Sequence, residues 1–217
     1  PAPWAAGGLA GRADWRRGAE PYLAGGGASR KVTRGADGGV DVEWHEGAAR
    51  HEAGSPNVIG AYAIASACKA LTEAGFEALA AREEALVRVV RDGLADVPGV
   101  RFLSLFGDDA PRVGVLSFVV EGWNSSHFAA ALSAEYGIGV RDGLFCAHPL
   151  LRRLLGGDAR AQGECGAADN AIRVSFGAGT PDEHVERFVR AVRELVRDGA
   201  RWTYRTVDGR CVPDVSA

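Results

Sequence analysis

The chain has 217 residues, 47% apolar and 24% charged, so it is long enough to bury a hydrophobic core and does not have the composition of a disordered protein. Its net charge of −3 and its interspersed arginines argue against nucleic-acid binding, and no apolar run is long enough to cross a bilayer. The four cysteines, Cys68, Cys146, Cys165 and Cys211, lack metal-ligand spacing and indicate a reducing cytoplasm rather than a metal site or a disulfide framework.

The first half of the chain opens with residues 4–11, which we expect to form the last strand of a larger sheet. A glycine-rich loop follows at 24–28, and the polar stretch up to about residue 49 predicts few strands. The sequence at 56–72 is apolar nearly all round, which predicts a helix buried between two layers. A second helix at 76–96, with an apolar stripe, is expected to lead into a smaller domain.

Strands and helices alternate in the second half, as in an α/β protein. The predicted strands are 100–105, 113–120, 137–141 and 171–176, and the predicted helices are 125–137, 149–155 and 181–198. We expect a loop at 155–170 and one more strand or an ordered tail after Trp202. Thr180 and Glu183 predict a capping box at the start of the last helix. The expected domains are therefore residues 1–97 and 98–217.

A lone cysteine, Cys146, lies on the expected turn between the strand ending at Arg141 and the helix that contains Pro149 in its first turn. Such a turn is a suitable place for a reactive thiol, and the positive charge of Arg141 favours the nucleophilic thiolate. An unpaired cysteine is also often a small buried apolar side chain. The segment by itself leaves both interpretations open.

The segment before the long apolar helix has a helix-start pattern, with Ser55 as the expected N-cap and Pro56 at the first helical position. The unpaired backbone N–H groups of a helix start, together with the Ser55 hydroxyl, are suited to binding a phosphate. The same residues also suit an ordinary cap that binds no ligand.

Together these segments resemble the class V aminotransferase family of pyridoxal-phosphate (PLP) enzymes, and within it the group II cysteine desulfurases and selenocysteine lyases. Residues 51–57 match the family's phosphate-contact segment, an aromatic residue followed by Glu-Ala-Gly-Thr-Pro-Asn, with Ser55 in place of threonine. Residues 141–150 resemble its active-site segment, Arg-x-Gly-His-His-Cys-Ala-x-Pro-Leu. Residues 172–175 resemble the strand that carries the substrate-binding arginine, and the resemblance continues to about residue 197.

The resemblance implies an α/β chain that forms the C-terminal portion of the fold type I of PLP-dependent transferases, namely the end of the large domain and the small α+β domain. It assigns Cys146 as the catalytic residue and Arg173 and Arg141 as substrate-binding residues. It also assigns Gly54 and Ser55 as cofactor-binding residues that reach the partner's PLP across a homodimer interface.

PLP enzymes hold their cofactor through a lysine, and neither lysine of this chain matches the family's lysine segment. Lys31 lies in a polar stretch, and Lys69 lies inside the long helix. The resemblance places the Schiff-base lysine upstream of Pro1. We therefore expect the C-terminal part of a longer enzyme, inactive on its own.

The resemblance implies a cysteine desulfurase, in which the Cys146 thiolate takes the sulfur of L-cysteine as a persulfide and leaves L-alanine. Leu144 and Phe145 replace the family's histidine pair, which leaves open an aminotransferase, epimerase or lyase that acts on another amino acid without persulfide chemistry. The missing lysine leaves open a third interpretation, a catalytically inert fragment or binding module. The expected partners are an amino-acid substrate and a second subunit.

Overall fold

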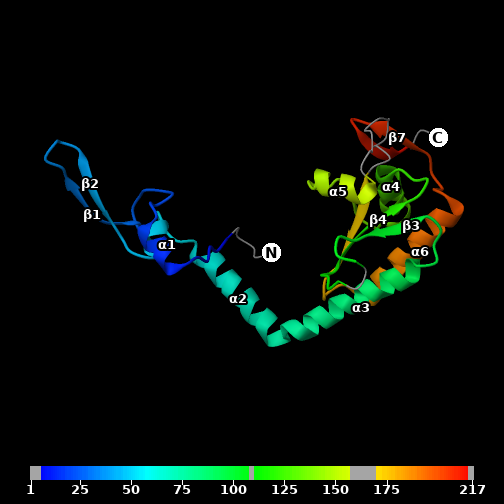
Figure 1. The fold of residues 1–217 in the computed structure, drawn as a ribbon, viewed down its shortest axis with the longest axis horizontal. Coiled ribbons are helices and arrows are strands. Elements are labelled where there is room, and N and C mark those ends of the chain that lie inside the picture. Colours follow the sequence, from blue (N-terminus) through cyan, green and yellow to red (C-terminus); the bar gives the residue numbers. More distant parts are fainter. Residues whose placement is uncertain (1–5, 108–109, 157–169, 215–217) are drawn as a thin grey trace. The chain divides into compact units, whose positions relative to one another are not determined.

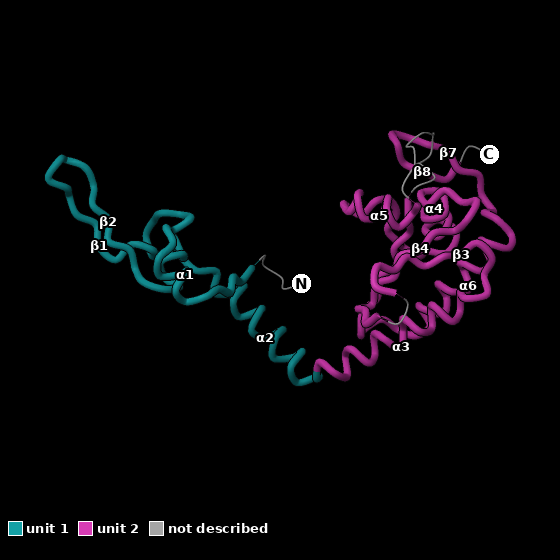
Figure 2. The backbone as a smooth tube through the Cα atoms, viewed as in Figure 1, with its two compact units in different colours: residues 1–75 teal, residues 76–217 magenta. Residues whose placement is uncertain are grey.

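The computed structural model describes residues 6–107, 110–156 and 170–214 (Figure 1). They form two compact units, which divide between Gly75 and Phe76 (Figure 2). The division precedes the expected boundary at 97/98 because helix α3 (Phe76–Leu94) packs against helix α6 (Asp182–Asp198) within the second unit. The assignment of residues 1–97 and 98–217 to a large and a small domain stays a prediction.

The first unit contains two short helical segments, a hairpin and one long helix. Its elements are α1 (Ala13–Gly18), β1 (Ser29–Arg34), β2 (Val40–Trp44), η1 (Ala49–His51) and α2 (Val58–Ala74). The antiparallel β1–β2 hairpin contradicts the expectation of a strand-poor stretch. Its turn is stabilised by the Asp37 carboxylate, which accepts a hydrogen bond from the Gly39 N–H at 2.9 Å, and by the positive φ of Gly38. The strand expected at 4–11 is absent from its described residues, 6–11.

Helix α2 is exposed within the first unit. Val58, Ile59 and Tyr62 are 69%, 63% and 76% exposed, and Gly60 is the only buried residue of the helix. The expectation that this helix lies between two layers is therefore not met within the unit, because its apolar side chains lack a covering layer there.

The second unit is built on a four-stranded antiparallel sheet in the order β3-β4-β6-β5. The strands are β3 (Val100–Leu103), β4 (Val115–Val120), β5 (Arg141–Gly143) and β6 (Ala171–Ser175). Helices α3, α4 (Ser125–Tyr136) and α6 share the main core with one face of this sheet, and helix α5 (His148–Leu155) belongs to a smaller cluster on the other face. None of the described helices is both long enough and apolar enough to span a membrane.

Alternation along β4 explains the two faces. Leu116, Phe118 and Val120 are buried in the main core, whereas Val119 packs on the smaller cluster with Leu151 of α5. Where α3 and α6 pack together, Gly93 allows close approach, because a Cβ atom there would lie 2.7 Å from Cγ1 of Val189. Among the described elements, three helices therefore pack on the first face of the sheet, and α5 packs on part of the second.

The helix ends show where local sequence signals hold. Asn124 caps α4 by accepting hydrogen bonds from the N–H groups of Ser126 and His127, and Gly137 ends the helix in the left-handed conformation, which agrees with the helix expected at 125–137.

Two other expected helix starts are wrong. The N-cap of α2 is Asn57 and not Ser55, since the Asn57 side chain accepts the Gly60 N–H at 2.9 Å. Helix α6 begins at Asp182, and the Thr180 hydroxyl accepts a hydrogen bond from the Gly177 N–H, so the capping box does not form. In both segments the helix begins after the proline instead of including it.

The C-terminal residues form a hairpin, β7 (Tyr204–Val207) and β8 (Arg210–Pro213), that packs on α4. The Glu135 carboxylate accepts hydrogen bonds from the N–H groups of Arg201 and Trp202 and, at 2.8 Å, from the Tyr204 hydroxyl. This bond and burial raise the pKa of Tyr204 above its ordinary value, burial being the larger cause.

The same docking encloses His127 of α4. The ring centroid of His127 lies 5.2 Å from that of Trp123 and 4.8 Å from that of Tyr204. Its Nε2 atom is buried and has no hydrogen-bond partner among the described residues. Burial lowers the pKa of His127 below 6.5, against a smaller opposing effect of the Glu135 charge.

Candidate active site

Strand pairing in the second unit brings two predicted site residues together. Arg141 on β5 is the direct antiparallel partner of Arg173 on β6, and Arg173 in turn pairs with Ser117 on β4. Directly paired residues point to the same face of a sheet, so the two guanidinium groups share one face. They are separated by 32 positions in sequence, and only the fold makes them neighbours.

The shared face is rich in positive charge. Arg141 is exposed and Arg173 is half-buried, with its Nε atom buried and without a hydrogen-bond partner among the described residues. Neither guanidinium forms an ion pair with a described acidic side chain. Two paired arginines without a carboxylate partner among the described residues form a suitable site for an anionic ligand group.

Cys146 lies on the turn that leaves β5 and enters α5, as the sequence indicates. Its thiol is exposed and free. Both Phe145 and Cys146 adopt the left-handed backbone conformation, with φ of 52° and 57°. This conformation is unfavourable for residues other than glycine and is found at functional turns where the surroundings enforce it.

Phe145 is a part of this site whose role the sequence did not indicate. Its ring centroid lies 5.2 Å from Cζ of Arg173, which is the geometry of a cation–π contact. Leu144 and Phe145 also pack on the small apolar cluster that contains Leu151 and Ala171. The only signal in the sequence was that Phe145 and Leu144 replace a histidine pair.

Gly54 and Ser55 belong to the first unit, where both are exposed in the segment before α2. Gly54 has a φ of 83°, and its N–H donates a hydrogen bond to the Gly26 carbonyl. Glycine at position 27 allows the two backbone segments to approach closely, because a Cβ atom there would lie 3.0 Å from the backbone oxygen of Glu52. The glycine-rich loop thus holds the turn that precedes the α2 N-terminus.

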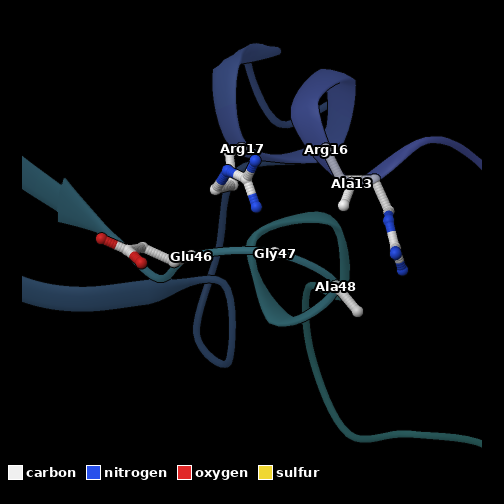
Figure 3. A pocket seen from close by; sticks show the side chains of 6 residues that line it. All are labelled: Ala13, Arg16, Arg17, Glu46, Gly47 and Ala48. Carbon is white, nitrogen blue, oxygen red and sulfur yellow. The ribbon is translucent and has the colours of Figure 1, made fainter.

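A separate hollow in the first unit is lined by α1 and by the segment after β2 (Figure 3). Its lining residues are Ala13, Arg16, Arg17, Glu46, Gly47 and Ala48. The hollow is polar, and it contains none of the residues that the sequence predicts for the active site. Beside it, His51 stacks on Trp15 and its Nε2 lies 2.9 Å from the Arg16 carbonyl oxygen, which fixes η1 against α1.

Comparison with known proteins identifies the family, because residues 2–188 match the family described as Aminotransferase class-V. The chain belongs to the class V aminotransferase family. A probable cysteine desulfurase of Mycolicibacterium paratuberculosis is 36% identical over 151 residues, which cover 70% of this chain and 20% of that protein. A probable cysteine desulfurase of Aeropyrum pernix is 30% identical over 179 residues, covering 82% of this chain and 40% of that protein.

Solved structures agree with this membership. The cysteine desulfurase of Thermococcus onnurineus in its apo form matches with a TM-score of 0.68 at 30% identity, covering 86% of this chain and 42% of that chain. The Escherichia coli cysteine desulfurase CsdA matches with the same TM-score at 27% identity. This class V aminotransferase chain therefore spans less than half the length of the relatives that it matches.

Members of the class V aminotransferase family use PLP, and the described residues fit only one end of that cofactor. The exposed Ser55 hydroxyl could donate a hydrogen bond to the phosphate, whereas the Gly54 N–H is already donated to the Gly26 carbonyl. The aldehyde end requires a lysine amine in a protected site. Lys31 is exposed on β1, and Lys69 is 76% exposed on α2 with its amine 3.8 Å from the Glu73 carboxylate. Neither lysine is suited to bind PLP covalently.

Proposed function

We propose that this chain is the C-terminal part of a PLP-dependent cysteine desulfurase, with the Schiff-base lysine on a segment outside it. The observation that carries the proposal is the exposed thiol of Cys146 on the turn that follows β5, the strand on which Arg141 pairs with Arg173. The similarity to cysteine desulfurases at about 30% identity supports the same chemistry. We place the enzyme in the cytoplasm, in keeping with its free thiols.

Arg173 is proposed to bind the substrate carboxylate. Its half-buried guanidinium presents a planar fork of N–H donors, which matches a carboxylate better than the point charge of a lysine. Arg141, its exposed cross-strand partner, adds a second positive charge to the same face. We expect this pair to orient an amino-acid substrate before the reaction begins.

Cys146 is proposed to accept the sulfur. PLP, when bound, withdraws electrons from the bonds at the substrate Cα. The Cys146 thiolate attacks Sγ of L-cysteine, a sulfur–sulfur bond forms, the Cβ–Sγ bond breaks, and a proton is added at Cβ. One thiol and one L-cysteine yield one persulfide and one L-alanine, so no external oxidant is required.

Gly54 and Ser55 are proposed to contact the phosphate of PLP in the partner subunit of a homodimer. The position of this turn on the exposed side of the first unit is compatible with such a contact. Replacing Ser55 with alanine should weaken PLP binding by about 1 kcal/mol, the contribution of one hydrogen bond. A monomeric holoenzyme would exclude the shared site.

The decisive experiment is Cys146→Ser in the holoenzyme that contains this chain. The variant should lose alanine and sulfide production from L-cysteine and keep the bound PLP spectrum, because the thiol does not hold the cofactor. Cys68→Ser is the matched control, since Cys68 is also an exposed free thiol but lies on α2. Normal turnover by Cys146→Ser would refute the desulfurase proposal.

The replacement of the histidine pair by Leu144 and Phe145 favours a second candidate, an aminotransferase, epimerase or lyase that acts on another amino acid. In that case Cys146→Ser keeps most of its activity, whereas Arg173→Ala is impaired in either enzyme because the carboxylate contact is lost. Screening amino acids with the two variants separates the candidates.

The absence of a suitable lysine favours a third candidate, a catalytically inert module. We expect the 217-residue chain mixed with PLP and borohydride to form no specific adduct on Lys31 or Lys69. A stoichiometric adduct on either lysine would contradict the proposal that the Schiff base lies outside this chain. A holoenzyme without activity toward any amino acid would favour the inert module.

A further inference from the structure

The turn at Phe145 and Cys146 holds an unfavourable backbone conformation that other contacts must stabilise. Among the described residues, positive φ outside glycine occurs only at these two positions and at Asp208. Aspartate tolerates this region, but a phenylalanine followed by a cysteine does not favour it. Consecutive left-handed residues of this kind persist only when surrounding contacts outweigh their cost.

The Phe145 side chain supplies those contacts. It packs on the small apolar cluster between α5 and the sheet, which includes Leu103, Leu151 and Ala171. Its ring also lies against the Arg173 guanidinium, with 5.2 Å between the ring centroid and Cζ. A single side chain therefore connects the backbone of the cysteine turn to the arginine on β6.

This contact limits the orientations in which the Arg173 guanidinium can meet a ligand. A guanidinium packed against a ring keeps its N–H donors free at its edge, and that edge is the part that binds a carboxylate in a fork. The Arg173 Nε atom is buried without a hydrogen-bond partner among the described residues, and Arg141 adds charge from the neighbouring strand. The ring restricts the plane of the guanidinium before any ligand binds.

We propose that Phe145 is a positioning residue whose ring fixes the Arg173 guanidinium for edge-on binding of an amino-acid carboxylate, while its apolar packing, which a leucine can also make, holds Cys146 in its left-handed turn. The inference deepens the proposed function and rests on it for the identity of the substrate. It assigns to Phe145 a role that requires an aromatic ring and not merely an apolar side chain.

The test compares Phe145→Leu, which keeps an apolar side chain but removes the ring, with Phe145→Tyr, which keeps the ring. In the holoenzyme, Phe145→Leu should raise KM for L-cysteine about tenfold with kcat changed much less, the factor expected for a partly desolvated cation–π contact. Phe145→Tyr should restore KM to within about twofold. Phe102→Leu is the matched control, because it removes the Arg91–Phe102 cation–π pair in the main core and should leave KM unchanged.

A second measurement is independent of the reaction. In nitrogen-15 NMR spectra of the 217-residue chain, the Arg173 Nε–H resonance should be shifted by the Phe145 ring current, and propionate should perturb it further. Phe145→Leu should lose the ring-current shift and bind propionate about threefold or more weakly. If Phe145→Leu does not fold, Arg173→Lys, which keeps the charge and lacks the planar fork, should raise KM and weaken propionate binding in the same way.

Each outcome tests either the positioning role of Phe145 or the proposed desulfurase function. An unchanged KM and unchanged propionate affinity in Phe145→Leu, or the absence of a ring-current shift in the parent chain, overturns the positioning role. A parent holoenzyme without activity toward L-cysteine, combined with propionate binding that depends on the ring, overturns the proposed function and supports the role of Phe145. Equal KM increases in Phe145→Leu and Phe145→Tyr would also overturn the positioning role, because a variant that keeps the ring would then be impaired as much as one that lacks it.

Discussion

Gly114, the buried residue before β4, is the described glycine whose added Cβ atom would make the shortest contact. Its carbonyl accepts a hydrogen bond from the Phe176 N–H at 2.7 Å, and its own N–H donates to the Glu83 carboxylate of α3 at 3.1 Å. A Cβ atom on residue 114 would overlap the Phe176 carbonyl oxygen. Because that oxygen is part of the backbone, the strand itself has to move.

The cost of Gly114→Ala follows from these contacts. Displacing the backbone weakens two hydrogen bonds, each of which contributes about 1 kcal/mol. Overpacking in a buried site adds about 1–3 kcal/mol. We expect the free energy of unfolding to fall by about 3 kcal/mol, and the urea midpoint by about 1.5 M if the slope is near 2 kcal/mol per M.

The assay is urea unfolding of the chain, followed by tryptophan fluorescence. Gly139→Ala is the control, because a Cβ atom there meets no atom within 4 Å and its φ is not positive. The control should lie within about 0.5 kcal/mol of the parent, as surface substitutions do. A Gly114→Ala midpoint equal to that of the control would refute the proposed overlap between Cβ and the Phe176 carbonyl.

Three further predictions concern α4 and the cysteine turn. Because burial lowers the pKa of His127 in the folded state, the unfolded state takes up a proton first as pH falls through 6.5. The free energy of unfolding should therefore decrease below that pH. His127→Phe should remove this pH dependence from a stability profile measured by urea unfolding. Glu135→Ala should speed hydrogen exchange in the C-terminal hairpin, with a loss of about 1–2 kcal/mol, while Glu186→Ala on the exposed face of α6 should not. Cys146→Asn should be about 1 kcal/mol more stable than Cys146→Val in thermal unfolding, because asparagine tolerates a φ of 57° and valine does not; equal melting temperatures would contradict the left-handed turn.

Strong local signals made much of the second unit predictable. The helix from Ser125 to Tyr136 has an asparagine cap and a glycine stop, and both signals act within one turn. The Cys146 turn was also predictable from the proline-led helix after it, although the strand before it is β5 (Arg141–Gly143) and not the apolar stretch expected at 137–141. The first unit was predicted less well, because β1 and β2 are short and almost entirely exposed. Two signals were overlooked there, namely the Asp37-Gly38 turn and the alternation of Val40, Val42 and Trp44 with charged residues along β2.

The candidate site was predictable only as separate residues. The sequence indicated Arg141 and Arg173 individually, but their position opposite one another depends on the order of strands in the sheet. The contact between Phe145 and Arg173 depends in addition on a backbone conformation that phenylalanine rarely adopts. Local propensities predict against such a conformation, so sequence reasoning did not identify it.

Helix α6 and the hairpin that follows it determine where a fragment of this protein can be cut for expression. The family match stops at residue 188, inside α6, yet Ala191, Val192 and Leu195 of the same helix are almost completely buried. A fragment trimmed to the family match would lose these side chains, and one trimmed after α6 would uncover His127. The smallest piece of the second unit that keeps a complete interior therefore extends through β8, well beyond the part of the sequence by which relatives are recognised.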